Sequence, residues 1–239
     1  SVLWEKAFHQ PNLTCHLNAS VCDATTEGDR ITSVTAWQST TQTWHTIEAE
    51  LFVSTPFLRD KYAGWQPRLL PAVSPYRECP GPAPESRRVF YHGSASHLAE
   101  HRWLRPVIEE VLARVPGATF EVIGDARVAR IYDGLARTSV IPPMGWSAYR
   151  SFVTEPGRAV GLAPLLPSRF NRARAPTKYF DICAAGAAGV YADDPVYQGT
   201  IRDGENGRLA PMDPSTWVES IVTLLRDPAV RMAMSGVGR

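Results

Sequence analysis

Several features that would point to other classes of protein are scarce or missing from this chain of 239 residues. The 25 basic residues almost balance the 24 acidic ones, and the two signs are interspersed, so nothing indicates a nucleic acid or another polyanion as a partner. No apolar run approaches the roughly 20 residues of a membrane-spanning helix. The first seven residues lack the basic-then-apolar plan of a signal peptide. We therefore predict a cytoplasmic protein without a transmembrane segment, and peripheral attachment to a membrane stays open.

Cysteine is also sparse, with four residues and no CxxC pair. A chain of this length buries a sizeable core without disulfide bonds, so we expect the thiols to be reduced. His97 and His101 have the helical i,i+4 spacing of a zinc site, but the order HLAEH is not the HExxH of metalloproteases. We predict no metal and no cofactor.

From residue 89 onward, short β-rich runs alternate with helical patterns. The expected strands are 89–92, 119–123, 139–141, 159–165 and 189–192. One expected helix follows Ser96, has its apolar face at 104–115 and ends at Pro116-Gly117, and two more lie at 176–185 and 214–226. The first helix contains Pro106, which either kinks it or starts a second segment. Strands and helices that alternate at this spacing predict an α/β fold with a doubly wound parallel sheet.

The first 88 residues are less regular. Residues 50–54 resemble a strand and 56–62 a short helix, whereas residues 10–45 show no clean period. The stretch 74–88 is rich in proline and serine and is the best candidate for a linker. We therefore divide the chain into residues 1–75, a linker at 76–88 and a second domain at 89–239.

Small and polar residues follow the first strand of the second domain. Ligands of doubly wound sheets bind beyond the carboxyl ends of the strands, and small residues beside a helix N-terminus let phosphates approach the backbone. Gly93, Ser94 and Ser96 are therefore candidates for a phosphate site. The sequence is not G-x-G-x-x-G, which disfavours a nicotinamide cofactor. The alternative is an ordinary strand-to-helix turn with Ser96 as the N-cap.

A second candidate is the stretch GLAPLLPSRFNRARAPTKYFDICAAG, residues 161–186. Here a strand leads through a polar loop into a helix with Lys178 in its first turn and Asp181 three residues later, on the same face. A cation in the first turn opposes the helix dipole, so we expect Lys178 to face an anion such as a diphosphate. Asp181 would then accept hydrogen bonds from ribose hydroxyls. The alternative is an i,i+3 salt bridge on a solvated face. Of the arginines in SRFNRAR, we expect at most one to contact a ligand.

This stretch, the following strand, the DGENG turn at 203–207 and the helix containing Trp217 together resemble the carboxyl-terminal half of glycosyltransferase family 4. The resemblance covers residues 89 to about 235, with a weaker trace at 50–55 and 69–71. It implies a GT-B-like architecture of two Rossmann-type domains, with an abbreviated acceptor-side domain in residues 1–75. It also implies transfer of a sugar from a nucleotide diphosphate sugar, with retention of configuration and usually without a metal.

The resemblance assigns roles residue by residue. Asp181 takes the position of the family's second motif glutamate, which binds ribose, and Ala173 replaces the first motif glutamate. Lys178 and Asn171 are the catalytic candidates. The full set of residues predicted to bind the nucleotide sugar is Gly93, Ser94, Ser96, His97, Ser168, Phe170, Asn171, Lys178 and Asp181.

Enzymes of this family usually exceed 300 residues, so we expect a fragment or an abbreviated relative. Two alternatives to a transferase stay open. One is a degenerate glycosyltransferase that binds a nucleotide or docks on a partner, and the other is a sugar-nucleotide epimerase of the same architecture. The acceptor is a glycan, a lipid or a small molecule, and the sequence does not determine the oligomeric state.

Overall fold

The structure is a computed structural model that describes residues 19–27, 30–38, 43–48, 52–69, 72, 74–76, 80–93 and 95–237. The chain divides into two compact units, one of residues 1–75 with 173–175, and one of residues 76–172 with 176–239. Among the described residues, no helix combines the length and the hydropathy that crossing a membrane requires.

The first unit contains two small sheets. In the first sheet, three antiparallel strands pair in chain order: β1 Ala19–Glu27, β2 Arg30–Gln38 and β3 Thr43–Glu48. In the second sheet, two short strands pair in parallel and are joined by a helix: β4 Phe52–Val53, α2 Pro56–Lys61 and β5 Arg68–Leu69. Helix α2 starts where Pro56 fixes the backbone and the Thr55 hydroxyl accepts a hydrogen bond from the Leu58 N–H. The assignment of residues 1–75 to an acceptor-side Rossmann-type domain stays a prediction.

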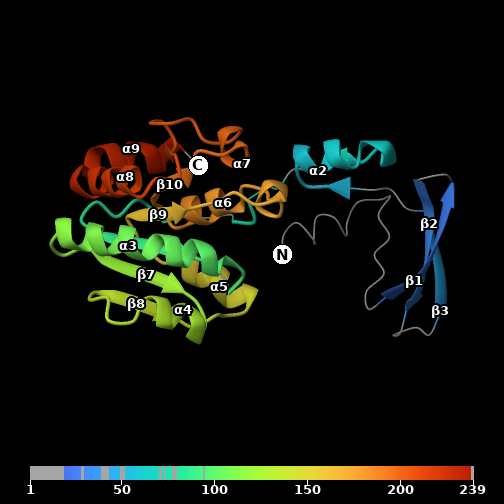
Figure 1. The fold of residues 1–239 in the computed structure, drawn as a ribbon, viewed down its shortest axis with the longest axis horizontal. Helices are drawn as coiled ribbons and strands as arrows, with labels where there is room; N and C mark the ends of the chain where they lie inside the picture. The colour runs from blue at the N-terminus through green and yellow to red at the C-terminus, as the bar shows by residue number, and fades with distance from the viewer. Residues whose placement is uncertain are drawn as a thin grey trace. The chain divides into compact units, whose positions relative to one another are not determined.

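The second unit is built on a six-stranded parallel sheet with the order β11-β10-β9-β6-β7-β8 (Figure 1). The chain fills one half of the sheet outward from β6 and then returns to fill the other half outward from β9. This is the strand order of a doubly wound Rossmann-type fold. The strands are β6 Arg88–His92, β7 Thr119–Ile123, β8 Thr138–Ile141, β9 Val160–Ala163, β10 Ala188–Ala192 and β11 Arg208–Ala210.

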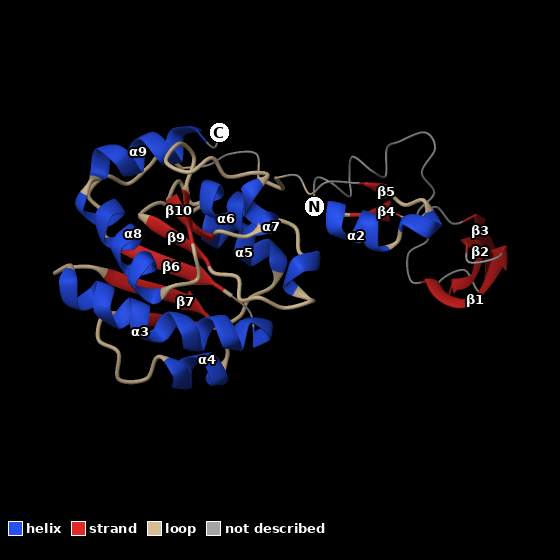
Figure 2. Ribbon diagram, turned by 45° about the horizontal axis from the view of Figure 1, so that its top comes forward, coloured by secondary structure: helices blue, strands red, loops and turns tan. Residues whose placement is uncertain are grey.

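Helices cover both faces of this sheet (Figure 2). Successive strand residues point to opposite faces, so the Tyr91 ring meets His101 of α3 while the His92 ring meets Phe152 of α5. Helix α8 packs beside α3, where Trp103 and Trp217 meet edge to face with centroids 5.3 Å apart. The helices are α3 Leu98–Arg114, α4 Ala126–Ile131, α5 Trp146–Val153, α6 Thr177–Ala184, α7 Pro195–Gln198, α8 Pro214–Arg226 and α9 Pro228–Val237.

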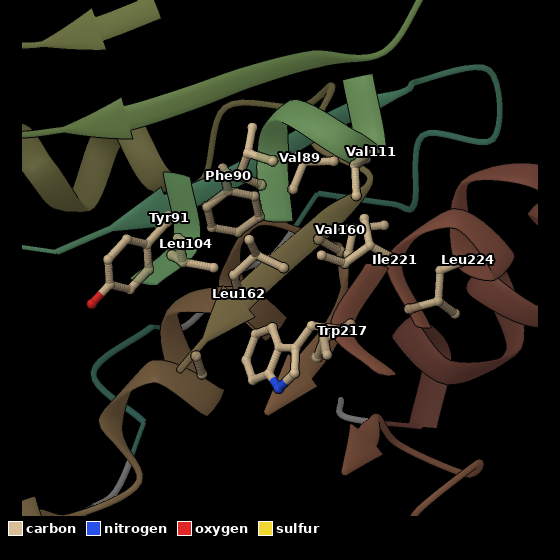
Figure 3. Packing of buried hydrophobic residues seen from close by; sticks show 14 of the residues in the cluster. Val89, Phe90, Tyr91, Leu104, Val111, Val160, Leu162, Trp217, Ile221 and Leu224 are labelled. Carbon is tan, nitrogen blue, oxygen red and sulfur yellow. The ribbon is translucent and has the colours of Figure 1, made fainter. Parts of the chain in front are cut away.

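The core of this unit lies between the sheet and the helices. Figure 3 shows side chains of α3 and α8 against those of β6 and β9, with Trp217 buried completely. Residues 80–88, within the expected linker, are anchored to the same unit. The Ser86 hydroxyl donates to the Gly157 carbonyl at 2.7 Å, and the buried Arg231 of α9 donates to the Pro84 carbonyl at 2.5 Å.

The predicted α/β class and the doubly wound parallel sheet are confirmed, and the five expected strands and three expected helices lie within a few residues of their predicted positions. Pro106 sits inside one helix that runs through it. Residues 10–45 show no clean period, yet β1, β2 and the start of β3 lie among them. The short helices α4, α5 and α7 and the last helix were also missed.

A substitution at Gly161 of β9 tests how closely helix α6 packs on the sheet. A methyl group added there would lie 2.5 Å from Ile182 Cγ1 and 2.8 Å from Phe90 Cζ. We predict that Gly161→Ala lowers the free energy of unfolding by about 1–3 kcal/mol in urea titrations. Gly199→Ala is the control, because nothing lies within 4 Å of its Cβ position, and it should change stability by less than about 0.5 kcal/mol. Equal effects would contradict the packing described.

Candidate functional site

The candidate site lies at the carboxyl ends of β6 and β9, the neighbouring strands from which the two halves of the sheet are wound in opposite directions. In doubly wound sheets, ligands bind in a crevice at such a point, because the loops after the two strands lead to opposite faces of the sheet. The loop after β6 leads into α3, and residues 164–176 lead from β9 into α6. Both stretches that the sequence singled out are therefore at the same crevice.

Helix α6 carries the two predicted charged residues toward the end of β6. The Lys178 ammonium donates to the His92 carbonyl, the last in β6, and lies 5.5 Å from the centroid of the Tyr91 ring. One turn later, the Asp181 carboxylate accepts a 2.6 Å hydrogen bond from the Tyr76 hydroxyl. The structure thus places the predicted cation at the strand end where the phosphate loop was expected.

The loop after β9 is fixed by Asn171, which is buried within a 3-10 turn. Its side-chain amide donates to Glu100 of α3 at 2.9 Å and to the Leu166 carbonyl at 2.7 Å, while its backbone N–H donates to the Ser168 hydroxyl at 2.9 Å. The neighbouring Phe170 has 67% of its surface exposed. Of the predicted loop residues, Asn171 and Ser168 form hydrogen bonds that fix the loop, whereas the Phe170 side chain is exposed to solvent.

A hydrogen bond from helix α3 fixes the start of the loop after β6. The imidazole of His101 donates from Nε2 to the Gly93 carbonyl at 3.1 Å. His97 is buried, and its Nδ1 lies 3.8 Å from the Glu100 carboxylate. The same carboxylate accepts the hydrogen bond from Asn171, so residues of the loop after β6 and of the loop after β9 both lie next to it. Ser96 is exposed and lies within a 3-10 turn, and the N-cap of α3 is His97, so the alternative of a Ser96 cap was wrong. Ser94 lies outside the described residues.

A buried charged cluster lies beneath the crevice. Glu121 of β7 accepts hydrogen bonds from Arg158 Nε at 2.5 Å and from His92 Nε2 at 3.0 Å, and the Arg158 side chain is completely buried. Burial alone would raise the pKa of Glu121, but the hydrogen bonds from His92 and Arg158 outweigh it and hold the pKa below its usual value. Burial lowers the pKa of His92, so its ring is neutral at pH 7.

The DGENG turn is structural in this chain. Gly204 adopts a φ of +81°, and the Asn206 side chain accepts from the Arg202 N–H at 2.7 Å and donates to the Thr200 carbonyl at 3.1 Å. Asp203 accepts from the Leu209 N–H at 2.9 Å. These bonds pair backbone N–H and C=O groups of the turn and fix the position at which β11 begins.

Sequence reasoning missed the residues that support the site, namely Glu100, Glu121 and Arg158. Glu121 gave a usable signal, because an acid in the middle of the apolar strand TFEVI needs a buried cationic partner. Nothing in the local sequence names Arg158 as that partner, since it lies 37 residues away.

No protein-family model and no curated protein matches the sequence. Among the solved structures that share the fold, three illustrate the likeness. S. aureus TarM, solved with UDP, α-GlcNAc-glycerol and fondaparinux, has a TM-score of 0.64 at 10% identity, over 79% of this chain and 39% of its own. The pneumococcal O-GlcNAc transferase GtfA, solved with UDP and GlcNAc, has a TM-score of 0.55 at 18% identity, over 78% of this chain and 40% of its own.

The third is the C-terminal domain of LpcC, a glycosyl transferase group 1 family protein from Francisella tularensis. It has a TM-score of 0.51 at 16% identity, and the match covers 66% of this chain and 91% of that domain. The chain spans about two fifths of the length of TarM and GtfA. The GT-B-like fold predicted from the sequence is confirmed.

The Glu121–Arg158 pair predicts a large effect on stability. Glu121→Gln leaves Arg158 as a buried charge without its counter-ion and should lower the free energy of unfolding by about 3–5 kcal/mol. The matched control is Glu109→Gln, which breaks the solvent-exposed i,i+4 pair with Arg105 and should cost at most about 0.5 kcal/mol. Urea titrations measure both, and similar losses for the two variants would contradict the account.

Stability should fall as the pH drops below about 6.5, the pKa of histidine in the unfolded chain. Burial lowers the folded-state pKa of His92 and His101, so below pH 6.5 the unfolded chain binds protons that the folded chain does not. Each histidine contributes up to about 1.4 kcal/mol per pH unit. Urea titrations at pH 7.5, 6.5 and 5.5 measure the slope, which His101→Gln should reduce. A flat profile would refute this assignment.

Proposed function

We propose that this chain binds a nucleotide diphosphate sugar at the crevice between β6 and β9 and transfers the sugar to an acceptor with retention of configuration. The observation that carries the proposal is the placement of Lys178 at the carboxyl end of β6, with Asp181 one helical turn further along α6. A cation and a hydrogen-bond acceptor at this spacing fit a diphosphate followed by a ribose.

Lys178 is suited to a diphosphate. Its ammonium group is a compact cation whose N–H groups only donate, and the bond to the His92 carbonyl holds this charge at the end of β6, where a diphosphate would bind. Helices α3 and α6 both start after the carboxyl ends of the neighbouring strands β6 and β9, so we propose that the positive ends of their dipoles add to this site. The proposed phosphate site therefore combines one side chain with two helix ends.

Asp181 is suited to the ribose. A carboxylate only accepts hydrogen bonds and has room for several, so the bond from Tyr76 leaves lone pairs for ribose hydroxyls. Ala173 replaces the family's first motif glutamate and offers no polar side chain. In this chain the proposed ribose contact thus rests on Asp181 and the phosphate contact on Lys178.

The proposed chemistry is positioning and charge stabilisation. As the bond to the sugar breaks, negative charge develops on the leaving diphosphate, and a donor placed there beforehand stabilises the transition state. Lys178 is that donor. Asn171 contributes by holding the loop between β9 and α6 against Glu100, so that the donor sugar meets a fixed wall. We propose no metal in this step.

The fold neighbours support this proposal by what was bound to them. TarM was solved with UDP and a GlcNAc-glycerol compound, and GtfA with UDP and GlcNAc. UDP is accordingly the first nucleotide to test, and GlcNAc the first sugar. The acceptor, which we propose to be a glycan, a lipid or a small molecule, needs residues outside the described crevice.

Titration calorimetry with UDP, GDP and ADP tests the proposal. We predict that at least one of the three binds, and that Lys178→Ala weakens its binding by roughly 10- to 150-fold, the worth of a hydrogen bond to a charged group. Asp181→Ala should weaken it by about tenfold. Arg130→Ala, which removes an exposed cation from α4, is the control and should leave the affinity unchanged.

Absence of binding by any of the three nucleotides would overturn the proposal. Binding of UDP without release or transfer of sugar from UDP-GlcNAc would instead favour a nucleotide-binding module over a transferase.

A further inference from the structure

We propose that the exposed indole of Trp146 is the surface on which the nucleobase of the bound nucleotide stacks. The inference rests on the proposed function, because it concerns the part of the nucleotide that neither Lys178 nor Asp181 binds. A nucleobase presents a flat π face, and aromatic side chains stack on such a face whichever base it belongs to. An exposed aromatic ring beside the proposed ribose site is therefore the feature that a base needs.

Trp146 lies at the edge of the sheet where the candidate site is. It is the first residue of α5, and only residues 142–145 separate it from the carboxyl end of β8. Helix α5 packs on the face of the sheet to which His92 points. Phe90 points to that face too, because it lies two residues before His92 in β6, and the Cβ position of Gly161 is close to both Phe90 and Ile182 of α6. Helices α5 and α6 thus cover the same face, and both begin at the carboxyl edge of the sheet.

One tyrosine connects the indole to the proposed ribose site. The Tyr76 ring lies with its centroid 6.4 Å from that of Trp146, and the Tyr76 hydroxyl donates to the Asp181 carboxylate at 2.6 Å. The distance between the indole and the carboxylate is therefore spanned by a single side chain. In a nucleotide the base is joined directly to the ribose, so a ribose bound at Asp181 has its base close to Trp146.

The indole is exposed but held in place. Trp146 has 47% of its surface exposed, which leaves part of the ring open to a ligand. Its centroid lies 5.9 Å from that of Tyr149, and the two planes are tilted by 31°. The Tyr149 hydroxyl in turn lies 3.3 Å from His92 Nδ1. A ring that its neighbours already orient loses little conformational freedom when a base stacks on it, which favours binding.

Arg158 fixes the helix that carries Trp146. Besides its bond to Glu121, Arg158 donates from Nη1 to the Phe152 and Glu155 carbonyls at the end of α5, both at 3.0 Å. Its guanidinium also lies 4.3 Å from the centroid of the Phe152 ring. Strand β7, the residues before β9 and helix α5 are thus joined through one side chain, which defines the position of α5 relative to the sheet.

Phe170 is the competing candidate, because among the described residues of the second unit it is the other strongly exposed aromatic side chain. It lies in the loop between β9 and α6, and the neighbouring Asn171 bonds to Glu100 of α3, on the other side of the candidate site from α5. Trp146 is favoured because its contact through Tyr76 places it next to Asp181, where the ribose is proposed to bind.

The test compares a nucleotide with the same molecule without its base. The probes are whichever of UDP, GDP and ADP binds, and ribose 5-diphosphate, both titrated calorimetrically into the whole chain. In the unsubstituted protein we expect the nucleotide to bind about 5- to 150-fold more tightly than ribose 5-diphosphate. Trp146→Ala should reduce this ratio to about twofold or less and leave the affinity for ribose 5-diphosphate unchanged.

Two further substitutions separate stacking from a loss of apolar bulk. Trp146→Phe keeps a π face and should preserve more of the ratio than Trp146→Leu, which keeps an apolar side chain without one. The matched control is Trp103→Ala. Trp103 of α3 also meets another aromatic ring, that of Trp217, but on the opposite face of the sheet. Its loss should leave the ratio unchanged even if stability falls.

The outcomes separate the two proposals. If none of the three nucleotides binds the unsubstituted protein, the proposed function fails and the stacking site fails with it. If a nucleotide binds and the ratio is the same in Trp146→Ala as in the unsubstituted protein, the stacking site is overturned and the proposed function stands. A ratio that is lost in Phe170→Ala but kept in Trp146→Ala would also overturn it, because the base would then lie beside the loop after β9.

Discussion

The α/β unit depends on one buried carboxylate, that of Glu121. It lies in the middle of a parallel strand, where burial of an unpaired charge would be prohibitive, and it is tolerated because Arg158 and His92 both donate to it. The same pair of bonds determines the state of His92 and the position of α5. The position of His92 in turn affects the candidate site. Its carbonyl accepts a hydrogen bond from Lys178, and its ring forms a hydrogen bond with the Tyr149 hydroxyl.

The fold was largely predictable because its signals are local. Buried parallel strands are short apolar runs, and proline and glycine mark where the helices begin and end, so five of the six strands of the sheet and the helices α3, α6 and α8 could be placed from the sequence. The short helices α4 and α5 carry too few turns for a clear period. The antiparallel strands between Ala19 and Glu48 are rich in threonine and serine and give little hydrophobic alternation to detect.

Only the outer residues of the candidate site could be proposed from the sequence. Lys178 and Asp181 could be proposed because helix position and spacing are visible in the sequence, and the strand order explains why the two candidate loops meet. The supporting residues could not be paired, because Asn171 and Glu100 are 71 positions apart and Glu121 and Arg158 are 37 apart. Such pairs are created by tertiary structure, and their local sequence carries no information about the partner.

The central claim is that a nucleotide diphosphate binds where β6 and β9 end. Amide hydrogen exchange with and without UDP tests it most directly, since it locates the ligand on the chain. The account predicts slower exchange at the junction of β6 and α3 and in the first turn of α6 around Lys178, and unchanged exchange in α9. Unchanged exchange throughout at saturating UDP, or protection confined to segments away from this crevice, would contradict it.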